Sequence, residues 1–259
     1  MRLALLSDVH GNPIALDAVL ADVQDQGGAD AYWVLGDLAA IGYDPIGALE
    51  RLAALPQVRF ARGNTDRYVV SGERPKPDLA QSALGDLDLV RLLVMIAGSF
   101  AWTQGAVTAT GWFPWLAGLP LEQRMTLPDG TRLLGVHASP GQDDGDGISP
   151  ATSDETLRGL LAGCDANLVC VGHTHRALDR TVDGVRVVNL GSVSNPHGSD
   201  LRASYVLLDA SVRGYDLRHR QVAYDVQAVI EDVERSGHPA ADFIIHHFRG
   251  QRRPSWEQP

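Results

Sequence analysis

The first 61 residues alternate between short apolar runs and segments with helical spacing, and this alternation restricts the fold more than any other feature. The runs at 3–6 and 31–35 are continuous, which is typical of strands buried on both faces, and 58–61 gives a third strand. Between them, Pro13 and Pro45 each follow a helix-capping residue. Strands joined through a helix pair in parallel. The sequence therefore predicts an α/β protein.

The alternation stops near residue 68 and strands return after residue 121. Turn signals at 128–130 and 183–184 are typical of hairpins. We predict a core formed by residues 1–67 and 122–245, a cap-like insertion at 68–121 and a C-terminal tail at 246–259. Further strands are expected at 132–136, 168–171, 185–189, 204–208 and 215–222, and further helices at 153–161 and 224–235.

No charged residue occurs between Arg91 and Glu122. Such a stretch raises the alternative of a bilayer span, but several glycines and prolines interrupt it. We expect a helix over 78–97 and interpret the rest as short elements packed on each other or on a partner. Residues 92–121 also offer a surface through which two copies of the chain could associate.

The composition indicates a globular protein with an acidic surface. The 259 residues carry 22 Lys and Arg against 32 Asp and Glu, which gives a net charge of −10. This balance disfavours binding of long nucleic acids, which requires clustered cations. The N-terminus lacks the longer apolar run of a signal peptide, and two cysteines are too few for a disulfide framework. We expect a cytoplasmic protein that does not bind membranes.

Polar side chains that are able to bind metals follow five predicted strands. Because the carboxyl ends of strands form the ligand crevice of open α/β sheets, we expect these side chains to lie together. Carboxylate, imidazole and amide ligands without thiolate suit Mn, Fe, Co, Ni or Zn. Their number suits two ions that share a bridging carboxylate, and Asp37 is the candidate for this bridge. The seven are Asp8, His10, Asp37, Asn64, His137, His173 and His175.

These residues stand in motifs that occur in one known family in the same order. The chain resembles the calcineurin-like metallophosphoesterases, and residues 8–16, 189–193 and 202–205 are similar to the small prokaryotic phosphodiesterase branch. No motif covers 68–121. The matching segments are Asp8-Val-His10, Gly36-Asp37, Gly63-Asn64-Thr-Asp66, Val136-His137 and Gly172-His-Thr-His175.

The resemblance implies a four-layer α/β/β/α sandwich with a dinuclear metal centre at one end. A metal-bridging hydroxide would be the nucleophile. By the same resemblance, Asp8, His10, Asp37 and His175 would hold one ion, and Asp37, Asn64, His137 and His173 would hold the other.

The sequence departs from the family pattern at Thr65, where many members have a histidine that is taken to assist the leaving group. Threonine does not donate protons near neutral pH. Asp66 is the nearest titratable group, and we interpret it as a hydrogen-bond partner of the Asn64 loop. Arg67 and Arg176 directly follow metal motifs and are candidate substrate contacts, although such arginines often pair with surface acids.

The motifs predict a metal-dependent phosphoesterase acting on small phosphodiesters or nucleotide-like molecules. Two divalent ions with two aspartates give the site a formal charge of about +2, which attracts phosphate despite the acidic total. Two alternatives stay open: a non-catalytic metal-binding scaffold of the same fold, and a protein Ser/Thr phosphatase.

Overall fold

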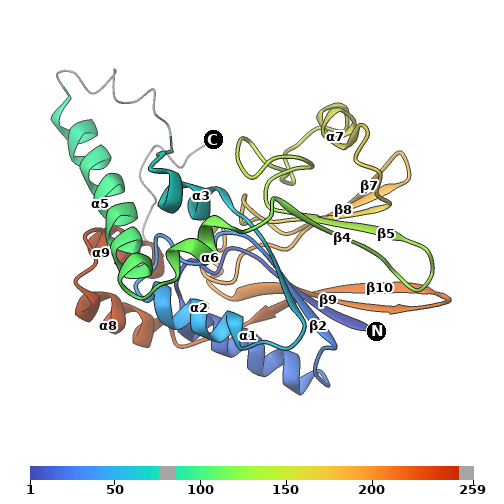
Figure 1. The fold of residues 1–259 in the computed structure, drawn as a ribbon, viewed down its shortest axis with the longest axis horizontal. Helices are drawn as coiled ribbons and strands as arrows, with labels where there is room; N and C mark the ends of the chain where they lie inside the picture. Colours follow the sequence, from blue (N-terminus) through green and yellow to red (C-terminus); the bar gives the residue numbers. More distant parts are fainter. Residues whose placement is uncertain (76–85, 251–259) are drawn as a thin grey trace.

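Two five-stranded sheets stack face to face between layers of helices in the computed structural model, which describes residues 1–75 and 86–250 (Figure 1). The first sheet has the order β10-β9-β1-β2-β3 and the second β4-β5-β6-β8-β7. The strands are β1 (Arg2–Leu6), β2 (Ala31–Leu35), β3 (Val58–Ala61), β4 (Glu122–Thr126), β5 (Arg132–Val136), β6 (Leu168–Val171), β7 (Leu178–Val182), β8 (Val185–Asn189), β9 (Ala203–Ser211) and β10 (Gly214–Val222).

Each sheet has a parallel centre. β1, β2 and β3 pair in parallel, as the strand–helix–strand pattern predicted, and β5, β6 and β8 do the same in the second sheet. The hairpin predicted at 183–184 joins β7 to β8, and both turn residues have positive φ angles, 48° at Asp183 and 83° at Gly184. The carboxyl ends of six parallel strands therefore lie at one edge of the stacked sheets.

The alternation of side chains along the strands sorts residues into layers. Leu5 and Trp33 point between the two sheets, where they pack with Leu133 and Cys170. Their neighbours along the strands point outward onto helices α1 (Pro13–Asp25) and α2 (Pro45–Ala53), because successive side chains of a strand face opposite sides. Helix α7 (Asp154–Leu161) covers the second sheet. The predicted four-layer α/β/β/α sandwich is confirmed.

The two predicted helix starts are also confirmed. The Asn12 side chain accepts a hydrogen bond from the Ala15 amide at 3.0 Å, and the Asp44 side chain accepts one from the Gly47 amide at 2.8 Å. Each satisfies a backbone donor that has no partner inside its helix.

The helices observed within 68–121 differ from the single helix expected over 78–97. A single helix, α5 (Leu87–Ala109), runs through the position where the predicted helix was to end, followed by α6 (Phe113–Ala117). Residues 78–85, the first part of the predicted helix, lie outside the described residues. Gly98 and Gly105 each cost a helix about 1 kcal/mol relative to alanine, and packing of α5 against α2 and α3 (Asn64–Ser71) offsets this cost.

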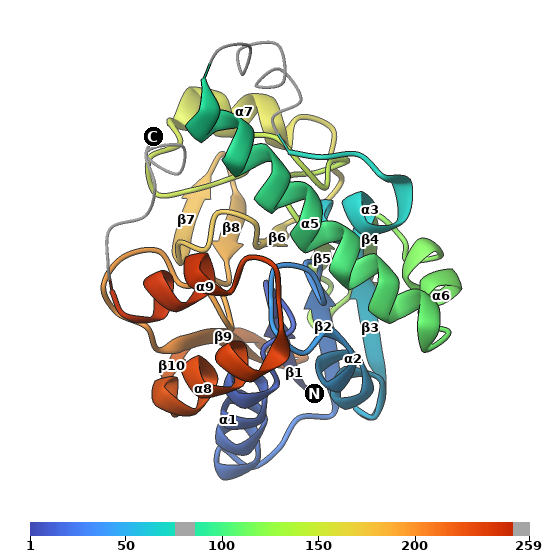
Figure 2. The same cartoon turned by 90° about the vertical axis from the view of Figure 1, so that its left-hand side faces the viewer.

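Helix α5 lies across the edge where the parallel strands end (Figure 2). It is long and apolar enough to cross a membrane by length and composition alone, although buried core helices meet the same criterion. Leu92, Phe100 and Val107 are buried, whereas Leu87 and Val94 are exposed. The aromatic residues beyond it, Trp112, Phe113 and Trp115, are half-buried and pack against the core of the first sheet.

Two C-terminal helices complete this side of the molecule. α8 (Val226–Ser236) and α9 (Ala241–Phe248) pack on each other. α9 crosses residue 246, where the sequence placed the start of the tail. His238 lies between them, with its Nε2 atom 3.3 Å from the Ser99 hydroxyl oxygen of α5.

Candidate metal centre

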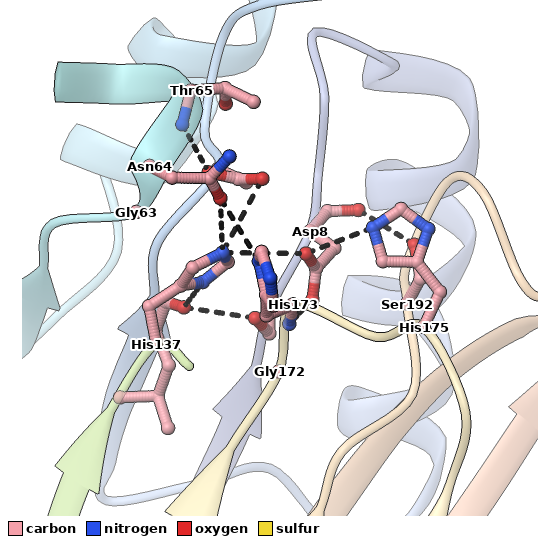
Figure 3. A network of polar contacts seen from close by, with 12 residues as sticks. Asp8, Gly63, Asn64, Thr65, His137, Gly172, His173, His175 and Ser192 are labelled. Carbon is pink, nitrogen blue, oxygen red and sulfur yellow. Dashed lines mark hydrogen bonds and ion pairs between the residues drawn. The ribbon is translucent and has the colours of Figure 1, made fainter. Parts of the chain in front are cut away.

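The seven predicted ligand residues meet at the carboxyl ends of the parallel strands. Figure 3 shows Asp8, Asn64, His137, His173 and His175 of this cluster. Asp8 and His10 follow β1, Asp37 follows β2, His137 follows β5, and His173 and His175 follow β6, whereas Asn64 is the first residue of α3. Chain segments up to 167 residues apart thus supply one cluster. Five of the seven residues are at most 9% exposed, and His173 and His175 are partly exposed.

The cluster divides into two groups that lie side by side. Asp8, His10 and His175 offer ligand atoms within 4.8 Å of one another, and so do Asp8, Asp37 and His137. Asp37 Oδ2 lies 3.7 Å from His10 Nε2 and 3.4 Å from His137 Nε2. Asp37 therefore stands between the two groups, where a bridging ligand belongs.

Asn64 and His173 complete the second group. Asn64 Oδ1 lies 3.1 Å from His137 Nε2 and 3.0 Å from His173 Nδ1. The amide oxygen thus faces two imidazole nitrogens, at the position that the strand-end pattern predicted.

A backbone carbonyl fixes the orientation of each imidazole. The Nδ1 atoms of His10, His137 and His175 donate to the carbonyls of Ala40 at 3.0 Å, Leu35 at 2.7 Å and Asn195 at 2.6 Å. Nε2 of His173 donates to the Gly145 carbonyl at 2.8 Å. In a neutral imidazole the nitrogen opposite the donor carries a lone pair. When neutral, each ring therefore directs a lone pair into the cluster, which is the orientation of metal-binding histidines.

Hydrogen-bond acceptors consequently face other acceptors. The Nε2 atoms of His10 and His175 lie 3.2 Å apart. Burial lowers the pKa of His10 to about 4, so its ring is neutral near neutral pH. Asp8 Oδ1 is buried without a hydrogen-bond partner among the described residues and lies 3.1 Å from His175 Nε2. Facing acceptors repel unless a cation lies between them, so the donor set fits divalent metal ions.

The electrostatics also favour positive charge at this point. Burial opposes ionisation of Asp37, but His137 and His10 outweigh it and hold the pKa of Asp37 below its ordinary value. Burial likewise opposes protonation of His137, but Asp37 and Asp8 outweigh it and raise the pKa of His137 to about 10. The two buried carboxylates thus stabilise a cation in the middle of the cluster.

The backbone is strained where the ligands stand. Asp8, His10, Asp37, His173 and His175 all have φ between 46° and 67°. They make up five of the nine non-glycine residues with positive φ in the described ranges. Such conformations cost of order 1–3 kcal/mol each and concentrate at functional sites. The strain marks the cluster as a built site rather than a chance meeting of polar residues.

Glycines let the ligand loops approach each other. A Cβ atom on Gly63 would overlap the Asp37 carboxylate, and one on Gly172 would overlap the Ser7 hydroxyl and lie 2.5 Å from Asp8 Oδ2. Only glycine fits these two positions, which explains the Gly-Asn and Gly-His pairs of the motifs.

Asp66 holds the loops in the way the sequence suggested. It is fully buried, and its carboxylate accepts hydrogen bonds from the amides of Asp37, Leu38 and Gly63 at 2.9–3.0 Å. Next to it, the Thr65 amide donates to Asp37 Oδ1 at 2.9 Å. The first turn of α3 therefore positions Asp37 as well as Asn64.

Two residues that support the cluster had no role in the sequence prediction. Asn189 is fully buried and donates to the carbonyls of Gly172 at 2.6 Å and Ile148 at 2.9 Å. The Ser192 hydroxyl donates to the Asp8 carbonyl at 3.0 Å. Both belong to the 189–193 motif, which was the available signal, but their hydrogen-bond partners are distant in sequence.

The two candidate arginines have protein partners. Arg67 forms ion pairs with Asp143, Asp144 and Glu73. Arg176 lies 2.6 Å from His197 through its Nη2 atom. Their roles as substrate contacts stay predictions.

Comparison with known proteins agrees with this geometry. The family model for the calcineurin-like phosphoesterase superfamily domain matches residues 1–213. An uncharacterized protein of Methanocaldococcus jannaschii is 24% identical, with 92% of this chain and 93% of that protein covered.

Two solved structures share the fold across nearly the whole chain. A hypothetical protein from Pyrococcus horikoshii OT3 has a TM-score of 0.77 at 20% identity and covers 97% of this chain and 99% of its own. A metallophosphoesterase from Sphaerobacter thermophilus has a TM-score of 0.72 at 24% identity, with 96% and 99% covered.

Proposed function

The chain belongs to the calcineurin-like phosphoesterase superfamily, and we propose that it hydrolyses small phosphoesters, with phosphodiesters and nucleotide-like molecules as the expected substrates. Two divalent ions would assist this reaction. Asp8, His10, Asp37 and His175 would hold one, and Asp37, Asn64, His137 and His173 the other.

One observation carries the proposal: buried carboxylate, amide and imidazole atoms that can bind a metal converge in one cluster. Asp8 Oδ1 has no hydrogen-bond partner in the described part of the chain, and the Nε2 atoms of His10 and His175 lie 3.2 Å apart. The donor types, oxygen and imidazole nitrogen, suit Mn, Fe, Co, Ni or Zn. Both cysteines are buried in hydrophobic clusters.

When bound, two such ions polarise a water molecule and neutralise the charge of phosphoryl oxygens. The residues of the chain supply the rest. Four backbone carbonyls hold the imidazoles in the productive tautomer, and Asp66 and Asn189 fix the loops that carry Asp37 and His173. This preorganisation places the ligands before substrate arrives, which reduces the reorganisation required during reaction.

The proposal is tested with a phosphodiester and a phosphomonoester assayed with each of Mn, Co, Ni, Zn and Mg. Asp37→Asn removes the charge between the two groups at nearly constant volume. We expect it to lower kcat/KM by at least about 100-fold and to reduce metal content measured by mass spectrometry. Asp200→Asn is the matched control, because Asp200 is exposed and pairs with Arg202.

Equal activity in the Asp37→Asn and wild-type proteins would refute the proposal. Metal binding without hydrolysis of either ester would instead favour the scaffold of the same fold. Activity restricted to phosphoserine or phosphothreonine peptides would favour the protein phosphatase.

A further inference from the structure

A cavity of about 250 Å³ opens beside the candidate metal centre. Asn64 and Thr65, in the first turn of α3, line it, and Asn64 also contacts His137 and His173. The remaining walls come chiefly from α5 and α9, through Ile96, Phe100 and Phe243 among others. The cavity therefore extends from Asn64, beside the centre, to the residues of α5 that line it.

The walls of this cavity are apolar. No Asp, Glu, Lys or Arg lines it among the described residues. Tyr68 and Phe100 meet edge to face, with ring centroids 5.6 Å apart. The volume is below the roughly 300–1,000 Å³ of pockets that hold drug-sized ligands. These properties suit one uncharged ring system and exclude a charged group, which would lose its hydration there without a partner.

One buried hydroxyl in the wall has no partner. Thr65 is 6% exposed, and its Oγ1 atom makes no hydrogen bond to the described residues. Leaving such a group unsatisfied costs about 1–3 kcal/mol. Thr65 directly follows the candidate ligand Asn64 and lines the cavity. A ligand oxygen within reach of this hydroxyl would satisfy it.

We propose that the cavity receives the organic group of the substrate, so that the protein acts on small phosphoesters of uncharged aromatic alcohols. The Thr65 hydroxyl donates a hydrogen bond to the ester oxygen. Hydrolysis breaks the bond from phosphorus to this oxygen and forms one from phosphorus to the oxygen of water. One proton of that water leaves with the alcohol, and the other stays with the phosphate product. This assignment rests on the proposed function.

The test compares three methyl phosphodiesters, with phenyl, 1-naphthyl and 4-carboxyphenyl groups, in three proteins. Ile96→Trp fills the cavity from α5. Val94→Trp is the control, because Val94 is 66% exposed on the same helix and does not line the cavity. Since each ester is compared with itself across the proteins, the intrinsic reactivity of its leaving group cancels.

We expect the ratio of kcat/KM for the phenyl or naphthyl ester to kcat/KM for the carboxyphenyl ester to be the same in the wild type and Val94→Trp, and to be lower by 10-fold or more in Ile96→Trp. Thr65→Val should lower the rates with the two preferred esters, and Thr65→Ser should restore them. Independently of activity, 1-naphthol fluorescence should report binding to the metal-free wild type and to Val94→Trp, but not to Ile96→Trp.

The outcomes separate the two proposals. Metal-dependent hydrolysis with the same ester preference in all three proteins would overturn the cavity assignment and leave the proposed function intact. No hydrolysis with any ester or metal would overturn the proposed function and this substrate class with it. Loss of 1-naphthol binding in Ile96→Trp would in that case still identify the cavity as a ligand site.

Discussion

His238 should make the stability of this protein depend on pH. Its side chain is 3% exposed and connects the turn before α9 to α5. Its Nδ1 atom accepts a hydrogen bond from the Ala240 amide at 3.1 Å, so protonation would place two donors against each other. Burial lowers the pKa of His238 from 6.5 to about 4.

The sign and size of the effect follow from linkage. Because the folded-state pKa is the lower one, the unfolded chain takes up this proton first as pH falls. Stability is therefore unaffected by His238 above pH 6.5, decreases between pH 6.5 and about 4, and changes no further below that. Each pKa unit corresponds to about 1.4 kcal/mol, so the loss amounts to at most about 3 kcal/mol.

The measurement is urea unfolding of the wild type and His238→Asn at several pH values from 7.5 to 4. Asparagine can accept the same hydrogen bond from Ala240 but does not titrate, so the difference between the two proteins isolates His238. We expect this difference to move in favour of the variant by up to about 3 kcal/mol as pH falls. His246→Asn, which changes an exposed histidine of α9, is the matched control variant. A difference between wild type and His238→Asn that stays constant with pH would refute the reasoning.

Three further predictions concern the candidate centre. Asp66→Ala should lower the free energy of unfolding by several kcal/mol. It leaves the buried amides of Asp37, Leu38 and Gly63 without their acceptor, which costs about 1–3 kcal/mol for each amide. Thermal unfolding measures this loss, and an unchanged midpoint would contradict the prediction. Gly172→Ala should weaken divalent metal binding, measured by calorimetry, by about 10-fold or more, because the added Cβ would displace Ser7 and Asp8. Gly159→Ala is the control: a Cβ there meets open space, so metal binding should stay unaltered. Mn or Zn at about 100 times its dissociation constant should stabilise the wild type by about 2.7 kcal/mol. Asp37→Ala, which removes the carboxylate that lies between the two groups, should abolish most of this gain; an equal gain in both proteins would place the metal elsewhere.

The sequence was informative wherever local patterns decide structure. The strands at 3–6, 31–35, 132–136 and 168–171 are short and apolar, and each is followed by a ligand residue. The sequence was less informative about the length of α5, because the glycines and threonines of this helix are typical of helix ends. In the structure the hydroxyls of Thr103, Thr108 and Thr110 donate to carbonyls four residues earlier, which a continuous helix permits.

The sequence alone determined which donor atoms the centre contains and that they follow parallel strands, because strand direction and the period of two are local properties. Only the tertiary structure decided how those atoms face one another. The carbonyls that orient His10 and His137 belong to residues 30 and 102 positions away in the chain, and α9 meets Asn64 and Thr65 around the cavity only after the chain has folded. Such contacts depend on packing between distant segments, which no local pattern in the sequence encodes.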